Sequence, residues 1–173
     1  LETAGFEVVL TQKRKCCGRP AFCQGNLRKA ARLGKHNLDL LGSEDSTPIL
    51  FLEPSCYSMF VEDYRELKLP NAEQIAKRCF LFEEFIENFL NKNPEAIRFA
   101  EKSEPVAIHA HCHAKSLLNP SFMARLAQRL PSRKVTLLET GCCGMAGAFG
   151  ALKSKYELSL QVAEPLIEKI QNQ

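Results

Sequence analysis

The run Lys134-Val-Thr-Leu-Leu-Glu139, followed by Gly141-Cys142-Cys143-Gly144, decides the expected architecture of this chain. The first part is apolar and typical of a buried strand, and the glycines and paired cysteines come straight after it. The same frame, Cys16-Cys17-Gly18, follows a second apolar run at residues 6–10. We therefore expect two strands, each followed by a Cys-Cys-Gly motif that opens a helix.

Strands and helices alternate along the rest of the chain. Apolar runs predict strands at 48–55 and 105–111, ending at Cys56 and Cys112. Helices are predicted for about 20 residues after Gly18 with a stop at Gly42, and at 57–67, 72–91, 120–130 and 154–170, the last kinked or restarted at Pro165. Apolar strands that alternate with helices indicate an α/β fold of mainly parallel sheets, covered by helices on both faces.

The chain contains an internal repeat. A shift of 126 residues places Cys16-Cys17-Gly18 on Cys142-Cys143-Gly144 and Val9 on Val135. More loosely, Pro48 begins a strand that ends at a cysteine, as Pro105 does. We interpret the repeat as two similar lobes, at residues 1–100 and 101–173, that supply cysteines from the carboxyl ends of strands. That edge is where open α/β sheets place their sites.

The same repeat indicates that both lobes are clipped. A counterpart of Cys56 in the second lobe would fall near position 182, beyond Gln173. A counterpart of Cys112 in the first lobe would lie before Leu1, and the chain begins without an initiator Met. We therefore expect a fragment of a larger protein, not active on its own, that lacks part of its ligand set at each end.

The composition excludes several classes of function. A net charge of +3, with no basic run longer than Lys13-Arg14-Lys15, argues against nucleic acid as the partner. No stretch approaches the ~20 apolar residues of a membrane span. There is no secretory signal, and the amphipathic helices favour an intracellular protein. We expect it in the cytoplasm, where it could lie at the inner face of the membrane.

Eight cysteines in 173 residues favour a metal site over a disulfide framework. Adjacent cysteines rarely bridge each other, because the ring is strained. Thiolate is the soft ligand of iron–sulfur clusters, and two adjacent cysteines suit neighbouring iron atoms better than one zinc ion. Gly18 and Gly144 remove a side chain where the backbone passes close to a bulky group. We expect Cys23 and Cys79, both on predicted helices, to pack as small apolar groups.

Three histidines flank Cys112. If the strand at 105–111 persists, His109, His111 and His113 share one face and Cys112 lies on the other. They could be metal ligands, proton carriers or donors behind the ligands, and the last role is the one we favour.

Four motifs in order resemble the cysteine-rich (CCG) domain family over essentially the whole chain. They are Cys16-Cys-Gly-Arg-Pro-Ala-Phe22, Glu53-Pro-Ser-Cys56, His111-Cys-His-Ala-Lys115 and Gly141-Cys-Cys-Gly-Met-Ala-Gly147. The pattern is most similar to the carboxyl-terminal iron–sulfur oxidoreductase region of FAD-linked oxidases, such as glycolate, D-lactate and D-2-hydroxyglutarate dehydrogenases. The domain also occurs in the B subunit of heterodisulfide reductase.

The resemblance implies an electron-transfer domain of a flavin-dependent 2-hydroxyacid dehydrogenase. It implies two sets of metal ligands, namely Cys16, Cys17 and Cys56 in the first lobe and Cys112, Cys142 and Cys143 in the second. Met59 stands where the heterodisulfide reductase relatives have a further cysteine. The residues that it implies to lie around the cofactor are Gly18, Gly144, His111, His113 and Lys115.

The same resemblance implies cofactors and partners for the parent protein. The cofactors are an iron–sulfur cluster of the 4Fe-4S type and an FAD in a flavin-binding domain or subunit elsewhere. The electron acceptor would be a molecule such as a quinone.

Two alternatives remain open. One is catalysis of thiol/disulfide exchange at a cluster, as in the heterodisulfide reductase relatives, which requires an open cavity beside the paired cysteines. The other is an interaction module stabilised by zinc, bound by Cys112, Cys142, Cys143 and one histidine. Metal and sulfide analysis separates these alternatives from the electron-transfer domain.

Overall fold

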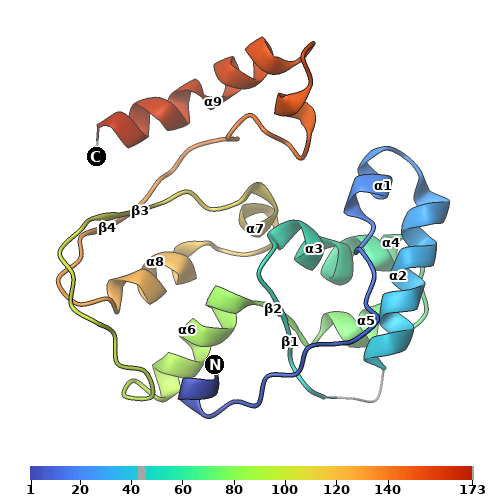
Figure 1. Ribbon diagram of the computed structural model, residues 1–173, viewed down its shortest axis with the longest axis horizontal. Coiled ribbons are helices and arrows are strands. Elements are labelled where there is room, and N and C mark those ends of the chain that lie inside the picture. The colour runs from blue at the N-terminus through green and yellow to red at the C-terminus, as the bar shows by residue number, and fades with distance from the viewer. Residues whose placement is uncertain (43–45, 173) are drawn as a thin grey trace. The chain divides into compact units, whose positions relative to one another are not determined.

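The computed structural model describes residues 1–42 and 46–172, which belong to two compact units, Leu1–Arg98 and Phe99–Gln173 (Figure 1). Within the described residues, each unit holds one two-stranded parallel sheet flanked by helices. The α/β class expected from the sequence is therefore confirmed. No helix in this part of the chain combines the length and the apolar character needed to cross a membrane.

The first unit is the more helical of the two. Its elements in chain order are the 3-10 turn η1 (Glu2–Ala4), α1 (Arg19–Cys23), α2 (Leu27–Leu41), β1 (Ile49–Phe51), α3 (Pro54–Ser58), the π-helical turn η2 (Met59–Asp63), α4 (Tyr64–Glu66), α5 (Ala72–Ala76), β2 (Cys79–Leu81) and α6 (Phe82–Lys92). In β1 and β2, Ile49 pairs with Cys79 and Phe51 with Leu81.

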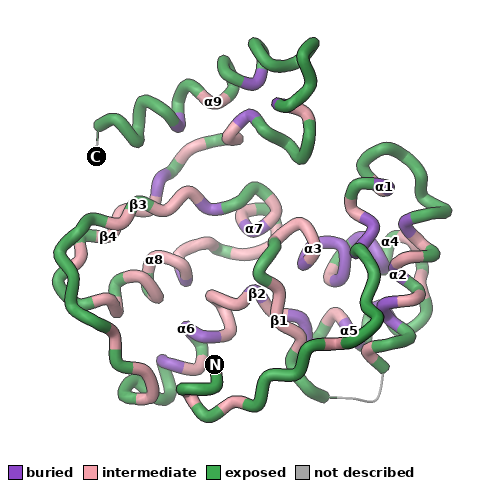
Figure 2. The backbone as a smooth tube through the Cα atoms, viewed as in Figure 1, coloured by how far each residue is buried: buried purple, intermediate pink, exposed green. Residues whose placement is uncertain are grey.

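The core of this unit lies between the sheet and the helices on either side of it. The buried stretches of α2 and α3–η2 are purple in Figure 2. Leu38, Met59 and Leu81 are at most 1% exposed, and burial of each such side chain contributes roughly 1.5–3 kcal/mol. The apolar packing of α2 and η2 therefore fixes the scaffold to which the first cysteine motif is attached.

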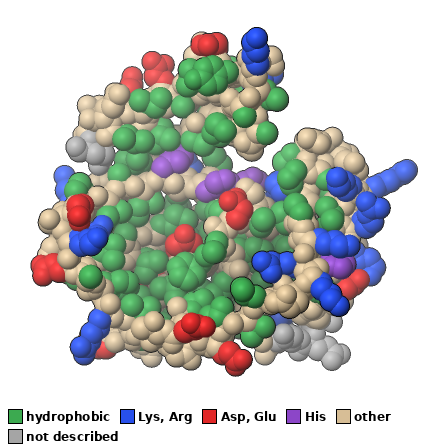
Figure 3. All heavy atoms as spheres, viewed as in Figure 1, with side chains coloured by type: hydrophobic (Ala, Val, Ile, Leu, Met, Phe, Trp, Pro, Cys, Tyr) green, Lys and Arg blue, Asp and Glu red, His purple; other side chains and the backbone are tan. Residues whose placement is uncertain are grey.

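The second unit has a smaller core. It contains β3 (Val106–Ile108), α7 (Cys112–Leu117), α8 (Ser121–Gln128), β4 (Val135–Leu137), the 3-10 turn η3 (Phe149–Ala151) and α9 (Tyr156–Gln171). Val106 pairs with Val135 and Ile108 with Leu137. Most apolar side chains of α9 are exposed, and hydrophobic atoms gather over this helix in Figure 3.

Several predicted elements need correction in the first unit. Residues 6–10 form no strand, and Val9 and Leu10 are exposed, because no neighbouring strand pairs with them within the described residues. The helix expected after Gly18 is two helices, separated by a turn in which Gly25 has a φ of 74°. It does end at Gly42, as expected.

The predicted helix at 72–91 is also wrong as a single element. It is interrupted by β2, because Cys79, Phe80 and Leu81 pair with β1 in the sheet. Cys79 therefore lies on a strand and not on a helix. The aromatic periodicity that favoured one long helix belongs to α6 alone.

The predicted strands at 48–55 and 105–111 are each shortened to three residues. Pro54 begins α3, so Cys56 lies inside a helix, and Cys112 is the first residue of α7. The strands β1 and β3 are only partly buried, and Ala107 is exposed, because both strands of a two-stranded sheet are edge strands. In the second unit the Cys-Cys-Gly motif leads into a loop and not into a helix, and α9 runs through Pro165 without a restart.

Candidate metal centres

The first cysteine motif is fastened to α2 through Asn37. The Asn37 side chain accepts a hydrogen bond of 2.8 Å from the backbone N–H of Lys15. It donates to the carbonyl oxygens of Lys15 and Cys16, at 3.1 and 3.3 Å. Asn37 is only 4% exposed, and a buried amide with three such bonds holds the preceding loop in one register.

Gly18 turns the chain from the motif into α1. Its φ of 92° lies in the left-handed region, and it caps the amino end of α1. A Cβ at this position would lie 3.1 Å from the Cα of Ala30, so a side chain would push α1 away from α2. The Gly18 N–H also points at the Cys16 sulfur, 3.5 Å away. The prediction that the first motif opens a helix is therefore confirmed.

Cys17 and Cys56 form a hydrogen-bonded thiol pair. The bond from Cys56 is the main reason that the pKa of Cys17 falls from 9.0 to about 6, against the opposing effect of burial. The backbone N–H and the charge of Arg19 add to the lowering of this pKa. The same bond, together with burial, raises the pKa of Cys56. Cys17 is thus the more acidic thiol of the two, and the thiolate is the form that binds metal.

In the second unit, Lys115 fastens the loop that precedes the second motif. Its ammonium group donates to the carbonyl oxygens of Thr140 and Gly141, at 2.8 and 3.0 Å. Past this point, the Gly144 N–H lies 3.3 Å from the Cys142 sulfur, which repeats the contact between Gly18 and Cys16 in the first unit.

At Gly144 the backbone of this loop passes close to α9. Its φ is 85°, and a Cβ there would lie 2.1 Å from the carbonyl oxygen of Ser159. Only glycine fits at this distance, since real contacts to a Cβ are essentially never below 3.0 Å. The tight approach of Gly144 is therefore to α9, a protein contact within the unit.

Cys112 lies beside the second pair. Burial raises its pKa, and so do the negative charge of Cys142 and a hydrogen bond with the Cys142 thiol, whereas Lys115 opposes the shift. The charge of Cys143 also contributes to raising the pKa of Cys112. The structure thus brings the three candidate cysteines of this unit into one neighbourhood.

The histidines do not line one face of a strand, because β3 ends at Ile108. His111 instead caps α7, and its Nδ1 accepts the backbone N–H of His113 at 3.1 Å. The rings of His111 and His113 stack with centroids 5.4 Å apart. His109 Nδ1 lies 3.0 Å from the Thr140 hydroxyl, and burial, Lys115 and His111 lower the pKa of His109. All three imidazoles therefore lie around the start of α7.

The remaining two cysteines differ from each other. Cys79 is 5% exposed and packs in the core, as expected. Cys23 is exposed at the end of α1, so the prediction that it packs as an apolar group is wrong. None of the eight cysteines forms a disulfide.

The two cysteine sets match the donor chemistry of an iron–sulfur group. Each gathers three soft sulfur ligands, with one backbone N–H directed at a sulfur of the pair. Over residues 1–42 and 46–172, however, no three Cys, His, Asp or Glu side chains already stand close enough to hold a metal ion. The donors therefore fit such a group in kind, and their side chains would have to move closer together to hold it.

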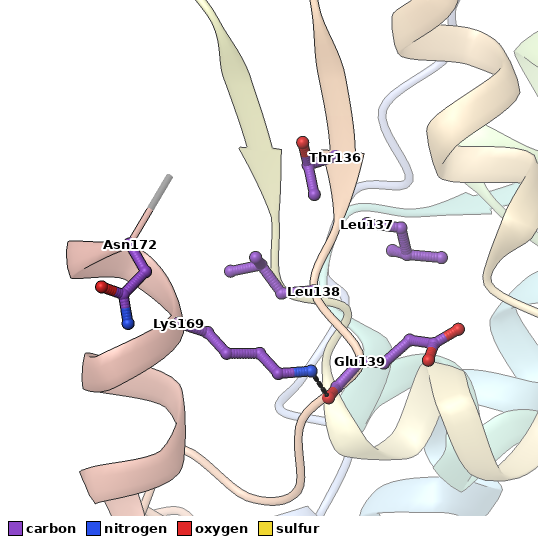
Figure 4. A pocket seen from close by; sticks show the side chains of 6 residues that line it. All are labelled: Thr136, Leu137, Leu138, Glu139, Lys169 and Asn172. Carbon is purple, nitrogen blue, oxygen red and sulfur yellow. Dashed lines mark hydrogen bonds between the residues drawn. The ribbon is translucent and has the colours of Figure 1, made fainter.

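A pocket of about 300 Å³ lies between the carboxyl end of β4 and α9 (Figure 4). It is lined by Thr136, Leu137, Leu138, Glu139, Lys169 and Asn172. Lys169 donates a hydrogen bond to the carbonyl oxygen of Glu139 across it. No cysteine lines this pocket, so it is not the cavity beside the paired cysteines that thiol/disulfide catalysis would require.

Sequence reasoning missed the polar side chains that hold the first site. Asn37 and Tyr64 reach the loop from 21 and 47 residues away, and Asp63 reaches Arg19 from 44 residues away. The buried Asn37 in an otherwise amphipathic helix was the one available signal, because a polar residue on an apolar face needs a partner.

The chain belongs to the cysteine-rich domain family, whose model matches residues 1–61 and 106–173. Each matched segment contains one Cys-Cys-Gly motif and one of the further candidates, Cys56 or Cys112. This places the chain in the family that its motifs resemble.

Individual relatives are similar over nearly all of the chain. The C subunit of anaerobic glycerol-3-phosphate dehydrogenase from Escherichia coli K12 is 23% identical over 99% of this chain and 44% of that protein. Lactate utilization protein A 1 of Bacillus mycoides is 24% identical over 98% of this chain and 70% of that protein. The chain thus spans less than half the length of the first relative. No solved structure matches it.

Proposed function

We propose that this chain is an iron–sulfur electron-transfer domain of a dehydrogenase system. The observation that carries the proposal is that cysteines from two separate segments interact with one another in each unit, in a chain of the cysteine-rich domain family. The names of the relatives, one a part of a dehydrogenase and the other a lactate utilization protein, support the same class.

The ligands in this proposal are Cys16, Cys17 and Cys56 in the first unit and Cys112, Cys142 and Cys143 in the second. A bound cluster supplies one-electron transfer. The protein's own part is to present the sulfurs, to direct the N–H groups of Gly18 and Gly144 at the pairs, and to surround them with the positive charges of Arg19 and Lys115. His111, His113 and Lys115 act around the ligands and not as ligands.

The finer assignment is a 4Fe-4S cluster that receives electrons from a flavin dehydrogenase of a 2-hydroxy acid. Lactate is such an acid, and the E. coli relative is one polypeptide of a larger dehydrogenase, which favours a separate flavin-binding partner that carries FAD. The electron acceptor would be a quinone or a similar carrier. This chain would lie in the cytoplasm and pass electrons to the acceptor from there. The electrons would pass through this chain between those two partners.

The decisive experiment is anaerobic reconstitution of the chain with ferrous iron and sulfide, followed by iron and sulfide analysis and visible and EPR spectra. We expect iron and sulfide in near-equal amounts and a spectrum that bleaches on reduction. Cys56→Ser and Cys112→Ser should each remove the signal of their own unit. Cys23→Ser, which changes an exposed cysteine outside both sets, is the matched control.

The outcomes separate the alternatives. Zinc without sulfide would overturn the proposal in favour of a zinc-stabilised module. An assembled cluster that reduces a disulfide substrate without any flavoprotein would instead favour thiol/disulfide catalysis. Equal losses in Cys23→Ser and Cys56→Ser would show that the assigned ligands are wrong.

A further inference from the structure

Arg19 connects the first cysteine motif to the helix that carries Cys56. It lies two residues after Cys17, and its guanidinium Nε donates to the carbonyl oxygen of Ser55 at 3.4 Å. The other end of the guanidinium contacts the Ser58 hydroxyl and forms an ion pair with Asp63. One side chain thus reaches both α3 and η2 from the start of α1.

This contact is sheltered. The side chains of Arg19 and Asp63 are 14% and 12% exposed, so solvent screens their attraction less than at the surface. The planar guanidinium makes its bonds in a fixed fork, which a lysine in its place could not reproduce. Arg19 therefore sets the distance from the Cys-Cys-Gly loop to α3, and not only the charge there.

Lys115 makes the corresponding connection in the second unit, from the opposite side. It belongs to α7, the helix that begins at Cys112, and its ammonium holds the carbonyls of Thr140 and Gly141 just before the paired cysteines. In the first unit the cation extends from α1, directly after the loop, to the helix that carries Cys56. In the second unit it extends from the helix that begins at Cys112 to the loop.

We propose that Arg19 and Lys115 are equivalent positioning residues, each of which fixes a Cys-Cys-Gly loop against the helix that bears the third cysteine of its unit. This inference rests on the proposed function for its purpose, because the loop and the helix supply one ligand set. It assigns Arg19 a role that its place after the motif does not reveal. It also assigns Lys115 a direct contact with the loop carbonyls.

The placement of charge agrees with this geometry. Arg19 and Lys115 each bring a cation to a loop that carries paired cysteines. Asp63 offsets part of the charge of Arg19, whereas Lys115 forms no ion pair with an acidic side chain among the described residues.

The first test uses the metal-free chain and needs no cofactor. Dibromobimane links two thiols that lie close together, and peptide mass spectrometry locates the loop-to-helix link in each unit. We expect Arg19→Met to reduce the link from Cys16 or Cys17 to Cys56 roughly tenfold, and Lys115→Met to reduce the link from Cys112 to the second pair by a similar factor. Each loss should stay within its own unit.

The matched controls each remove a cation that does not link a loop to a helix. Arg28→Met on α2 and Lys153→Met before α9 change exposed residues whose side chains make no hydrogen bond or ion pair within residues 1–42 and 46–172. Asp63→Asn leaves Arg19 in place and weakens only its ion pair, so the loss of cross-linking should be intermediate. This variant decides the question if Arg19→Met does not fold. Unchanged cross-linking in Arg19→Met and Lys115→Met would overturn the proposal.

The second test uses the reconstituted chain. Arg19→Lys keeps the charge but loses the fork, so cross-linking should fall while the midpoint potential of the first unit stays near that of the wild type. Arg19→Met should lower both. A wild type that assembles no cluster would end the proposed function, while the cross-linking of the metal-free chain would still decide the positioning role. A potential unchanged in Arg19→Met would overturn the electrostatic part.

Discussion

The phenolic oxygen of Tyr64 donates a hydrogen bond of 2.6 Å to the main-chain carbonyl of Cys17. Tyr64 lies at the start of α4 and is fully buried. Its ring also packs against Phe60, with centroids 4.8 Å apart. One side chain thus joins the core of the first unit to the cysteine motif, so the stability of the core and the position of the motif depend on each other.

Replacement of Tyr64 by Phe keeps the ring packing and removes only the hydroxyl. The Cys17 carbonyl then loses a buried partner, so we expect the free energy of unfolding to fall by about 1–3 kcal/mol. Urea denaturation measures the change. Tyr156→Phe, at a site that is 51% exposed, is the control and should be nearly neutral. Equal effects of the two substitutions would show that the bond to Cys17 is not stabilising.

Gly144→Ala should disrupt the second unit. The new Cβ would meet the Ser159 carbonyl at 2.1 Å, so the loop must separate from α9. Gly147→Ala is the matched control, because its φ of 68° is also left-handed but nothing lies within 4 Å of the added Cβ. We expect only about 1–2 kcal/mol for the control, from the backbone conformation. Hydrogen exchange of the α9 amides should rise strongly in Gly144→Ala and little in Gly147→Ala.

Gly34→Ala separates helix propensity from packing. Alanine in the middle of α2 would ordinarily stabilise the helix by about 1 kcal/mol. Here the added Cβ would lie 2.6 Å from the ring of Tyr64 and 2.7 Å from Leu69, both in contact with the core. We expect the clash to win, with a loss of roughly 1–3 kcal/mol in thermal or urea unfolding. A gain in stability would mean that the Tyr64 ring moves aside freely.

The buried thiol of Cys79 predicts a loss of stability at alkaline pH. Burial raises its pKa from 9.0 to about 12, so between these values the unfolded chain gives up a proton that the folded chain keeps. The stability contributed by the protonated thiol is complete below pH 9.0 and is lost as the pH rises towards 12.

Cys79→Ser tests this, because serine does not titrate in that range and can keep the hydrogen bond to the Ile75 carbonyl. Urea unfolding between pH 8 and pH 11 should show a shallower decline for the variant than for the wild type. Parallel declines would contradict the assignment to Cys79.

The α/β class, the parallel strands, the stop of α2 at Gly42 and the family followed from local pattern and motif spacing. The boundaries did not, because strand length depends on which neighbour completes the ladder. Residues 6–10 have the composition of a strand but pair with no strand in the described chain. Cys79–Leu81 fit a helical pattern in the sequence, yet in the structure they pair with β1. Pattern alone cannot decide between these outcomes.

The sequence by itself determined the chemistry of this protein: two Cys-Cys-Gly motifs, two further cysteines, and glycines where the backbone turns. Residue type fixes ligand softness and backbone freedom, and neither needs a fold to be recognised. Only the tertiary structure decided which side chains hold the sulfurs in place. Asn37, Tyr64, Arg19 and Lys115 act over separations of 21–47 residues, and such contacts exist only once packing has brought the segments together.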